Sequence, residues 1–326
     1  MFVRELEEGA QVECVLVVRE AELRAKRDGG QYLRLTLADR TGSVPANVWD
    51  DVASTAAIAV VGAPVRVSGR LQVSGRYGME LKLRALCAPE PDSFDVADLI
   101  DGPPRSPAQM EADLRELLAT VQDADLRCLL DAVFGIDSPL WARYRAAPAA
   151  KRFHQAYRHG LLEHSLSVAQ AVSAISATFS EINRDVAVAG ALLHDIGKLD
   201  AYTFAGSAIE MTDAGKLQGE IPLGYYRVRR LIEHIEGFDA RTAEAVLHII
   251  LSHHGSLEHG SPIVPCTREA TLVHFCDNLG GRLGSFDRLE KELPNGERWS
   301  RFDRVIGGGA YFAGPTVATR EEREAA

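Results

Sequence analysis

A change in hydrophobic pattern near residue 90 constrains the fold of this chain more than any other feature. Before it, apolar residues occur in short runs bounded by turn sequences such as residues 28–30, which is typical of β-strands. From Ala108 onward, apolar residues recur at helical spacing over longer segments. Two proline-rich stretches, residues 88–91 and 101–107, separate the patterns. We therefore expect two domains of different class.

The first pattern predicts a small barrel. Strands are expected at residues 11–19, 32–37, 44–49, 65–73 and 79–86, with a short helix at 53–61. Five strands with a helix between the third and fourth is the plan of an OB-fold, a small closed barrel.

The second pattern predicts an all-α domain. Helices are expected at residues 110–121, 126–134, 161–178, 184–196, 225–235, 241–252 and 269–279. Residues 199–222 carry glycines and are expected to be irregular. The predicted organisation is a barrel over 1–91, a linker over 92–107, a helical domain over 108–312 and a polar tail over 313–326.

Charge and cysteine content narrow the class of protein. The net charge of −10 argues against a protein coated for nucleic acid. Residues 1–91, however, carry twelve basic and twelve acidic side chains, so the excess acid lies beyond them. The net charge is therefore compatible with a local groove that binds nucleic acid. Five scattered cysteines favour reduced thiols in the cytoplasm. The sequence predicts no signal peptide and no membrane span.

An adjacent histidine and aspartate, His194 and Asp195, end an apolar stretch in the helical domain. Adjacent side chains on a helix point about 100° apart, so the pair can hold a metal ion from two directions. Lys198 lies four residues after His194, on the same face, where its ammonium can reach what the metal binds. A metal ion beside a cation suits phosphate chemistry.

Further imidazole and carboxylate groups follow in the same domain. Together they are His164, His194, Asp195, Glu220, His248, His253, His254 and Asp277. Such mixed sets bind Mn, Fe, Zn or Co. Four would make one site: His164, His194, Asp195 and Asp277. Asp195 has two oxygens and can bridge to a second ion, held by Glu220 with His253, His254 or both. Two ions about 3.5–4 Å apart can activate a water and stabilise a leaving oxygen at phosphorus.

The order His164, His194-Asp195, Asp277 matches the H…HD…D signature of the HD superfamily of metal-dependent phosphohydrolases. Longer stretches resemble the YhaM-type exoribonucleases. In the helical domain these are residues 148–151, 154–157, 160–164, 192–198, 251–258, 260–262 and 277–278, and in the barrel they are 32–42 and 48–50. The resemblance extends to about residue 312.

This resemblance implies an OB-fold ahead of an HD domain. It implies a metal-dependent 3′-to-5′ exonuclease that hydrolyses single-stranded RNA to nucleoside monophosphates, with single-stranded DNA as a further substrate to test. It implies Mn²⁺ as the ion, with Mg²⁺, Co²⁺ and Fe²⁺ as alternatives, and water as the nucleophile. By resemblance the ligands are His164, His194, Asp195 and Asp277, and Lys198 contacts the scissile phosphate.

Three positions depart from the family pattern. Glu220 stands where the family usually has histidine, Gln155 stands where a second histidine is common, and Gly280 replaces an acid. A glutamate is a hard oxygen ligand that favours Mn²⁺ or Mg²⁺. The alternative is that Glu220 weakens the second metal site. Our hypothesis is a two-metal site that includes Glu220.

The remaining polar and aromatic positions have competing interpretations. His248 is interpreted as a buried structural histidine, and one of His253 and His254 as a ligand with the other as its support. His154 is a candidate for substrate contact, with a packing role equally open. Arg34 and Arg76 belong to an alternating set of arginines that either lines a groove or is simply solvated.

Three aromatic residues of the barrel are candidates for stacking with bases. Tyr77 lies in a turn and is the better candidate, whereas Trp49 ends an apolar strand and is expected to be buried. Tyr32 is the third.

Two rival functions remain at this stage. One is an HD phosphohydrolase acting on a small nucleotide, which would not need a domain that tracks a strand. The other is a nucleic-acid-binding protein with a degenerate HD site, against which the complete ligand set argues. The sequence is also compatible with a homo-oligomer.

Overall fold

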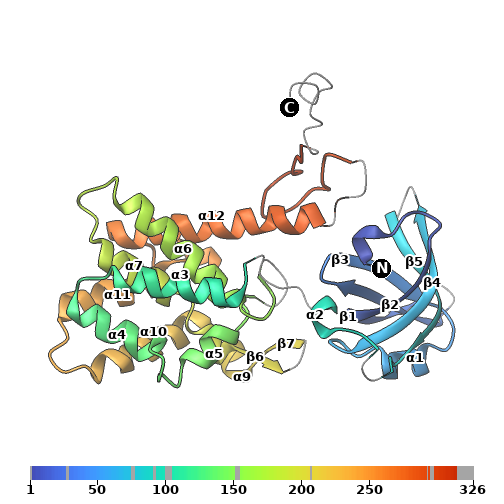
Figure 1. Cartoon of the computed structure of the whole chain (residues 1–326), viewed down its shortest axis with the longest axis horizontal. Helices are drawn as coiled ribbons and strands as arrows, with labels where there is room; N and C mark the ends of the chain where they lie inside the picture. The colour runs from blue at the N-terminus through green and yellow to red at the C-terminus, as the bar shows by residue number, and fades with distance from the viewer. Residues whose placement is uncertain are drawn as a thin grey trace.

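The computed structural model describes residues 2–26, 29–74, 78–90, 93–99, 105–150, 155–205, 208–291, 293 and 297–313. Its first part is β-structure and its second part is mostly helical, as Figure 1 shows. Both features confirm the predicted fold class.

The barrel contains five strands in the closed order β1-β2-β3-β5-β4. The strands are β1 (Gln11–Ala25), β2 (Gln31–Asp39), β3 (Gly42–Val48), β4 (Pro64–Ser74) and β5 (Gly78–Cys87). Helix α1 (Val52–Ile58) lies between β3 and β4, as the pattern predicts. Strand β1 is longer than expected because its second half pairs with β2, up to Ala25 opposite Gln31.

Alternation along the strands builds the core of the barrel. In β2, Leu33, Leu35 and Leu37 are buried, and the residues between them face outward. Where β4 meets β5, the register shifts between Ser68 and Gly69. A Cβ at Gly69 would lie 2.3 Å from the carbonyl oxygen of Lys82, so only glycine allows this close approach.

Helix α2 (Val96–Leu99) packs on the outside of the barrel. Leu99 joins Val17 and Ala38 in a small apolar cluster. The amide of Arg40 also donates to the carbonyl oxygen of Asp98 at 2.9 Å. The segment predicted as a linker, 92–107, therefore includes a helix that belongs structurally to the barrel, and its boundaries stay predictions.

The second part contains helices α3 to α12. Their bounds are α3 (Pro107–Ala119), α4 (Ala124–Phe134), α5 (Trp141–Ala146), α6 (Gly160–Ser176), α7 (Arg184–Leu193), α8 (Lys198–Ala201), α9 (Asp213–Gln218), α10 (Glu220–Glu233), α11 (Ala240–Ser252) and α12 (Arg268–Lys291). A short 3-10 helix at Leu257–His259 lies between α11 and α12, and another at Val3–Glu5 precedes β1 of the barrel.

The expectation of an irregular segment at 199–222 is wrong. It contains a hairpin of β6 (Tyr202–Ala205) and β7 (Ala208–Met211), followed by α9. Thr212 caps α9 by accepting a hydrogen bond from the amide of Gly215. A Cβ at Gly215 would lie 2.4 Å from the carbonyl oxygen of Ala201, so this glycine serves close packing and not irregularity.

Four helices, α6, α7, α11 and α12, pack against one another and form the core of this part. Caps define their starts: Asn183 begins α7 and Asp239 begins α11. A Cβ at Gly190 of α7 would lie 2.4 Å from the Cδ1 atom of Ile249, so the glycine lets α7 approach α11 closely. This packing brings the C-terminal ends of α7 and α11 close to the beginning of α6, where His164 lies.

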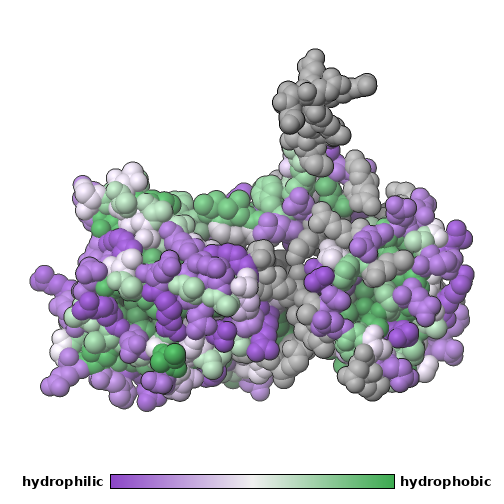
Figure 2. Space-filling view, viewed as in Figure 1, coloured by the Kyte–Doolittle hydropathy of each residue, from purple (hydrophilic) through white to green (hydrophobic). Residues whose placement is uncertain are grey.

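Helix α12 has one face in the helical core and another that exposes apolar side chains. It is longer than the predicted 269–279 because it continues to Lys291. Apolar surface follows the helix in Figure 2, and the exposed apolar side chains on it include Phe275, Leu279 and Leu283. Their spacing of four places them on one face.

Among the described residues, no helix is both long enough and apolar enough to span a membrane.

Candidate metal centre

Four predicted ligands converge from three helices. His164 lies on α6, His194 caps the C-terminal end of α7 with Asp195 after it, and Asp277 lies on α12. His164, His194 and Asp195 are only 1–3% exposed. Residues more than a hundred positions apart in the sequence thus share one buried polar centre.

The separations between donor atoms fit the coordination sphere of one ion. His164 Nε2 lies 3.0 Å from Asp277 Oδ1, 3.2 Å from His194 Nε2 and 3.5 Å from Asp195 Oδ2. His194 Nε2 lies 3.3 Å from Asp195 Oδ2 and 3.8 Å from Asp277 Oδ1. Ligands about 2.1 Å from an ion are themselves about 3.0–3.4 Å apart at octahedral or tetrahedral angles. His164, His194 and Asp277 therefore fit one divalent ion, and Asp195 Oδ2 lies close enough to both histidines to join them.

Main-chain carbonyls orient two of the imidazole rings. The carbonyl oxygen of Ala191 accepts a hydrogen bond from His194 Nδ1 at 2.7 Å, and that of Ile250 accepts one from His253 Nδ1 at 2.8 Å. A carbonyl only accepts, so each Nδ1 carries the proton. When the ring is neutral, Nε2 then offers its lone pair to the centre, as metal-binding histidines require.

The two oxygens of Asp195 face different donor groups. Oδ2 lies 2.6 Å from Lys198 Nζ and points toward His164 and His194. Oδ1 lies 3.6 Å from His253 Nε2. Both Oδ1 and that Nε2 are buried and have no hydrogen-bond partner among the described residues. Two unpartnered buried acceptors facing each other are costly without a cation between them, so this pair also fits a metal ion.

Glu220 and His254 form a neighbouring pair. Glu220 Oε1 lies 3.7 Å from His254 Nε2, and His254 Nδ1 donates to the carbonyl oxygen of His259 at 2.9 Å. A Cβ at Gly197 would lie 1.9 Å from the carbonyl oxygen of Glu220, so Gly197 lets the start of α10 approach the turn that carries Lys198. Glu220 and His254 lie outside the two tight groups of possible ligands, His164–His194–Asp277 and His194–Asp195–His253.

The centre is strongly polarised. Burial opposes ionisation of Asp195, but the Lys198 ammonium together with His194 and His253 outweighs it and holds the pKa of Asp195 well below its usual range. Burial likewise opposes the charge on Lys198, and the carboxylates of Asp195, Glu220 and Asp277 together raise the pKa of Lys198. For Asp277, burial is outweighed by the hydrogen bond from His164 together with the charges of the neighbouring histidines, so the pKa is lowered. Both carboxylates are therefore anionic and Lys198 is cationic at neutral pH.

His274 is a residue that the sequence patterns did not single out. Its Nδ1 donates to the carbonyl oxygen of His253 at 2.7 Å. Gly255 makes room for the ring: it has φ +82°, and a Cβ there would lie 2.0 Å from His274 Cε1. The available signal was spacing, because His274 precedes Asp277 by three residues on α12 and so lies on the same side of the helix.

The structure places the other sequence candidates away from this centre or outside the described residues. His248 is half-buried and not fully buried as expected, and it accepts a hydrogen bond from the amide of Cys266 at 2.9 Å. Arg34 is exposed on the outer face of the barrel. The candidates Arg76, Tyr77 and His154 lie outside the described residues.

The expectation that Trp49 is buried is wrong, since its side chain is 47% exposed. In β3, Val44, Ala46 and Val48 alternate toward the interior. Trp49 follows at the next position and therefore faces outward.

Comparisons with known proteins agree with both halves of this description. A family model for the HD domain matches residues 161–281, and one for an OB-fold nucleic acid binding domain matches residues 15–86. A protein from Geobacillus sp. (strain WCH70) named 3′-5′ exoribonuclease YhaM is 30% identical over 292 residues, which is 89% of this chain and 88% of that protein. The chain belongs to the YhaM-type exoribonuclease family. The HD match of this YhaM-type chain contains all four converging residues, from His164 to Asp277.

Two solved structures are similar to part of this YhaM-type chain. Both are domains of replication protein A from Methanococcus maripaludis. One is 23% identical and covers 27% of this chain and 91% of its own, with a TM-score of 0.23. The other, a second OB-fold domain, is 24% identical and covers 28% and 96%, also with a TM-score of 0.23.

Proposed function

We propose that this protein is a metal-dependent 3′-to-5′ exonuclease that hydrolyses single-stranded RNA to nucleoside monophosphates. The observation that carries the proposal is Asp195, whose two oxygens face separate donor groups while Lys198 lies 2.6 Å from one of them. Such an arrangement suits hydrolysis of a phosphodiester. The name of the Geobacillus relative and the OB-fold match support a polynucleotide as substrate.

In the proposal, the first ion would be held by His164, His194, Asp195 and Asp277. A second ion would be held by Asp195 and His253, with Glu220 and His254 as its further ligands. The carboxylate of Glu220 supports Mn²⁺ as the ion, with Mg²⁺, Co²⁺ and Fe²⁺ as alternatives. When bound, divalent ions supply positive charge that stabilises the negative charge developing at phosphorus.

The chain's own residues have distinct roles in this proposal. Lys198 is held charged by Asp195, and its ammonium donates to a non-bridging oxygen of the scissile phosphate. The main-chain carbonyls of Ala191 and Ile250 fix the rings of His194 and His253, which spares the site reorganisation during the reaction. The OB-fold holds the strand upstream of its 3′ end.

A reducing compartment, the cytoplasm, fits this function. All five cysteines are free thiols. No pair of them needs an oxidising environment for the fold.

Labelled RNA tests the function directly. The full chain is incubated with Mn²⁺ and single-stranded RNA labelled at its 5′ end, with and without a chelator. We expect a ladder of shortening labelled fragments that the chelator abolishes. Intact RNA together with hydrolysis of a small nucleotide would support a small-nucleotide phosphohydrolase instead. Binding without cleavage would indicate a degenerate site. Single-stranded DNA in a parallel reaction shows whether the sugar is discriminated.

A further inference from the structure

An exposed aromatic pair occupies one edge of the barrel. The rings of Tyr32 and Trp49 stack with centroids 4.5 Å apart and an angle of 16° between their planes. Tyr32 is half-buried on β2, and Trp49, just beyond β3, is 47% exposed. Because Tyr32 covers one face of the indole, a base would have to stack on the other face. Large aromatic side chains are usually buried, so an exposed pair calls for an explanation.

The backbone next to this pair is strained. Asp51, two residues after Trp49, has φ 50° and ψ 35°, a left-handed conformation that a residue with a side chain adopts at a cost. The turn connects β3 to α1 immediately after the indole. The protein thus maintains an unfavourable turn where the chain leaves Trp49 outside the barrel.

Cations accompany the stacked rings. Lys26 Nζ lies 5.6 Å from the centre of the Trp49 ring and donates to the carbonyl oxygen of Trp49 at 2.9 Å. Arg34 lies on the same outward side of β2 as Tyr32, two residues further along. Among the described residues, neither Lys26 nor Arg34 forms an ion pair with a carboxylate. Both cations can therefore contact a phosphate, although Glu22 lies opposite Arg34 across the β1–β2 ladder.

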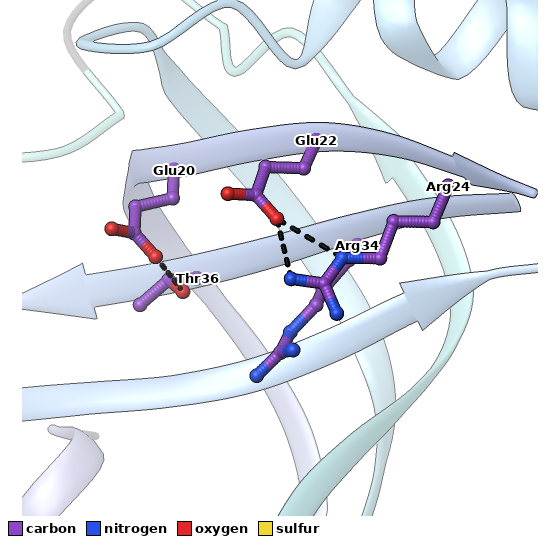
Figure 3. A pocket seen from close by; sticks show the side chains of 5 residues that line it. All are labelled: Glu20, Glu22, Arg24, Arg34 and Thr36. Carbon is purple, nitrogen blue, oxygen red and sulfur yellow. Dashed lines mark hydrogen bonds and ion pairs between the residues drawn. The ribbon is translucent and has the colours of Figure 1, made fainter.

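The neighbouring barrel surface is different, because its charges are balanced. Figure 3 shows the shallow hollow beside Arg34, lined also by Glu20, Glu22, Arg24 and Thr36. There Glu22 accepts hydrogen bonds from Arg24 at 2.7 and 3.0 Å, and Glu20 accepts one from Thr36 at 3.1 Å. On β5, Glu80 pairs with Lys82 at 3.1 Å. Glu20 and Glu22 offset the charges of Arg24 and Arg34 in this hollow, so the surface attracts a phosphate backbone only weakly.

We propose that the Tyr32–Trp49 pair is a stacking site for one nucleobase of a single-stranded nucleic acid, with Lys26 and Arg34 contacting its flanking phosphates. Binding to the barrel is then dominated by stacking and depends only weakly on salt. The inference rests on the proposed function, of which it specifies how the upstream strand is held. An aromatic face stacks on any base, so the site holds the strand without selecting its sequence.

Binding measurements with the full chain test this inference. The Asp195→Asn background prevents degradation, and a fluorescent single strand of about 20 nucleotides serves as the probe in an anisotropy titration. Trp49→Ala is expected to weaken binding about tenfold, and Trp49→Phe to weaken it less, because phenylalanine keeps a stacking face. Trp299→Ala is the matched control, since Trp299 is also exposed, at 62%, but lies in the C-terminal segment. It should leave binding unchanged. Circular dichroism verifies that each variant is folded.

A salt series tests the second half of the inference. The three phosphate contacts proposed for the full chain, by Lys26, Arg34 and Lys198, predict a slope of about −2.1 in a plot of log affinity against log salt. Trp49→Ala should keep this slope, because stacking releases no counterions. Equal affinity of Trp49→Ala and its parent, or a slope corresponding to about six or more contacts, would overturn the inference.

Degradation assays in the catalytically intact background separate this inference from the proposed function. If the wild-type protein shortens RNA and Trp49→Ala has an unchanged KM for the long strand, the stacking site is wrong and the function stands. If the wild-type protein shortens no RNA and Trp49→Ala still loses affinity for the strand, the stacking site stands and the function is wrong.

Discussion

The Nδ1 atom of His274 lies 2.7 Å from the main-chain carbonyl oxygen of His253, and this hydrogen bond joins α12 to the end of α11. Helix α12 also carries Asp277, and His253 caps α11 beside Asp195. The bond therefore connects two sides of the candidate metal centre. Gly255 makes it possible, because any larger residue there would collide with the His274 ring.

Disrupting this connection should weaken metal binding more than it weakens the fold. We expect His274→Ala to lower Mn²⁺ affinity about 10- to 100-fold, which is the usual effect of losing a group that orients a ligand. His274→Asn, which keeps a donor, should recover part of it. Isothermal titration calorimetry measures both. His259→Ala is the control, since His259 contributes its main-chain carbonyl to the site and the substitution keeps that carbonyl. Wild-type affinity in His274→Ala would show that the bond does not position the centre.

Lys198→Met should destabilise the metal-free protein but increase the stabilisation that Mn²⁺ provides. In the metal-free protein, Lys198→Met leaves the buried Asp195 carboxylate without its cation, which costs about 3–5 kcal/mol. Added Mn²⁺ replaces that charge, so the rise in Tm on adding Mn²⁺ should be larger in Lys198→Met than in the wild-type protein.

Activity provides the second readout for Lys198. Loss of a donor to the reacting phosphate should lower kcat about 10²- to 10³-fold in the metal-loaded variant. A variant with normal kcat would contradict the phosphate contact, and an equal or smaller Tm rise would contradict competition between Lys198 and the metal.

The pH dependence of stability should reflect His248. Burial lowers its pKa below 6.5, and its Nε2 accepts a hydrogen bond from the Cys266 amide, which only the neutral ring can do. The unfolded state therefore binds more protons than the folded state between the folded pKa and 6.5. The stabilisation is complete above pH 6.5 and is lost as the pH falls through that window.

Urea unfolding at several pH values measures this effect. His248→Gln should have a flatter dependence of the free energy of unfolding on pH below 6.5 than the wild-type protein. Cys266→Ser keeps the donating amide and should behave like the wild type. Parallel curves for His248→Gln and the wild type would exclude a depressed pKa at His248.

The predictable parts of the structure were those determined by local pattern. Alternating leucines such as Leu33 and Leu35 defined β2, because their period of two fits only a strand with one buried face. The convergence of His164 and Asp277, 113 positions apart, was predictable only from a motif whose order matches a family. Spacing alone does not show that α6 and α12 pack together.

The features that were missed depend on tertiary context. Glycines such as Gly215 suggested irregular structure, but this one is required by contact with Ala201. Trp49 was expected inside because it ends an apolar run, whereas one further step along the strand turns the side chain outward onto Tyr32. The sequence singled out Glu220 as a candidate ligand, but its position 3.7 Å from His254 follows from the packing of α10 against α11.

The number of Mn²⁺ ions bound per chain tests the central claim, that Asp195 is shared between two ions, most directly. Inductively coupled plasma mass spectrometry after Mn²⁺ loading and desalting should give two ions in the wild-type protein. It should give one in Glu220→Ala, which keeps the ligands His164, His194, Asp195 and Asp277. One ion in the wild-type protein, with the same value in Glu220→Ala, would contradict the account.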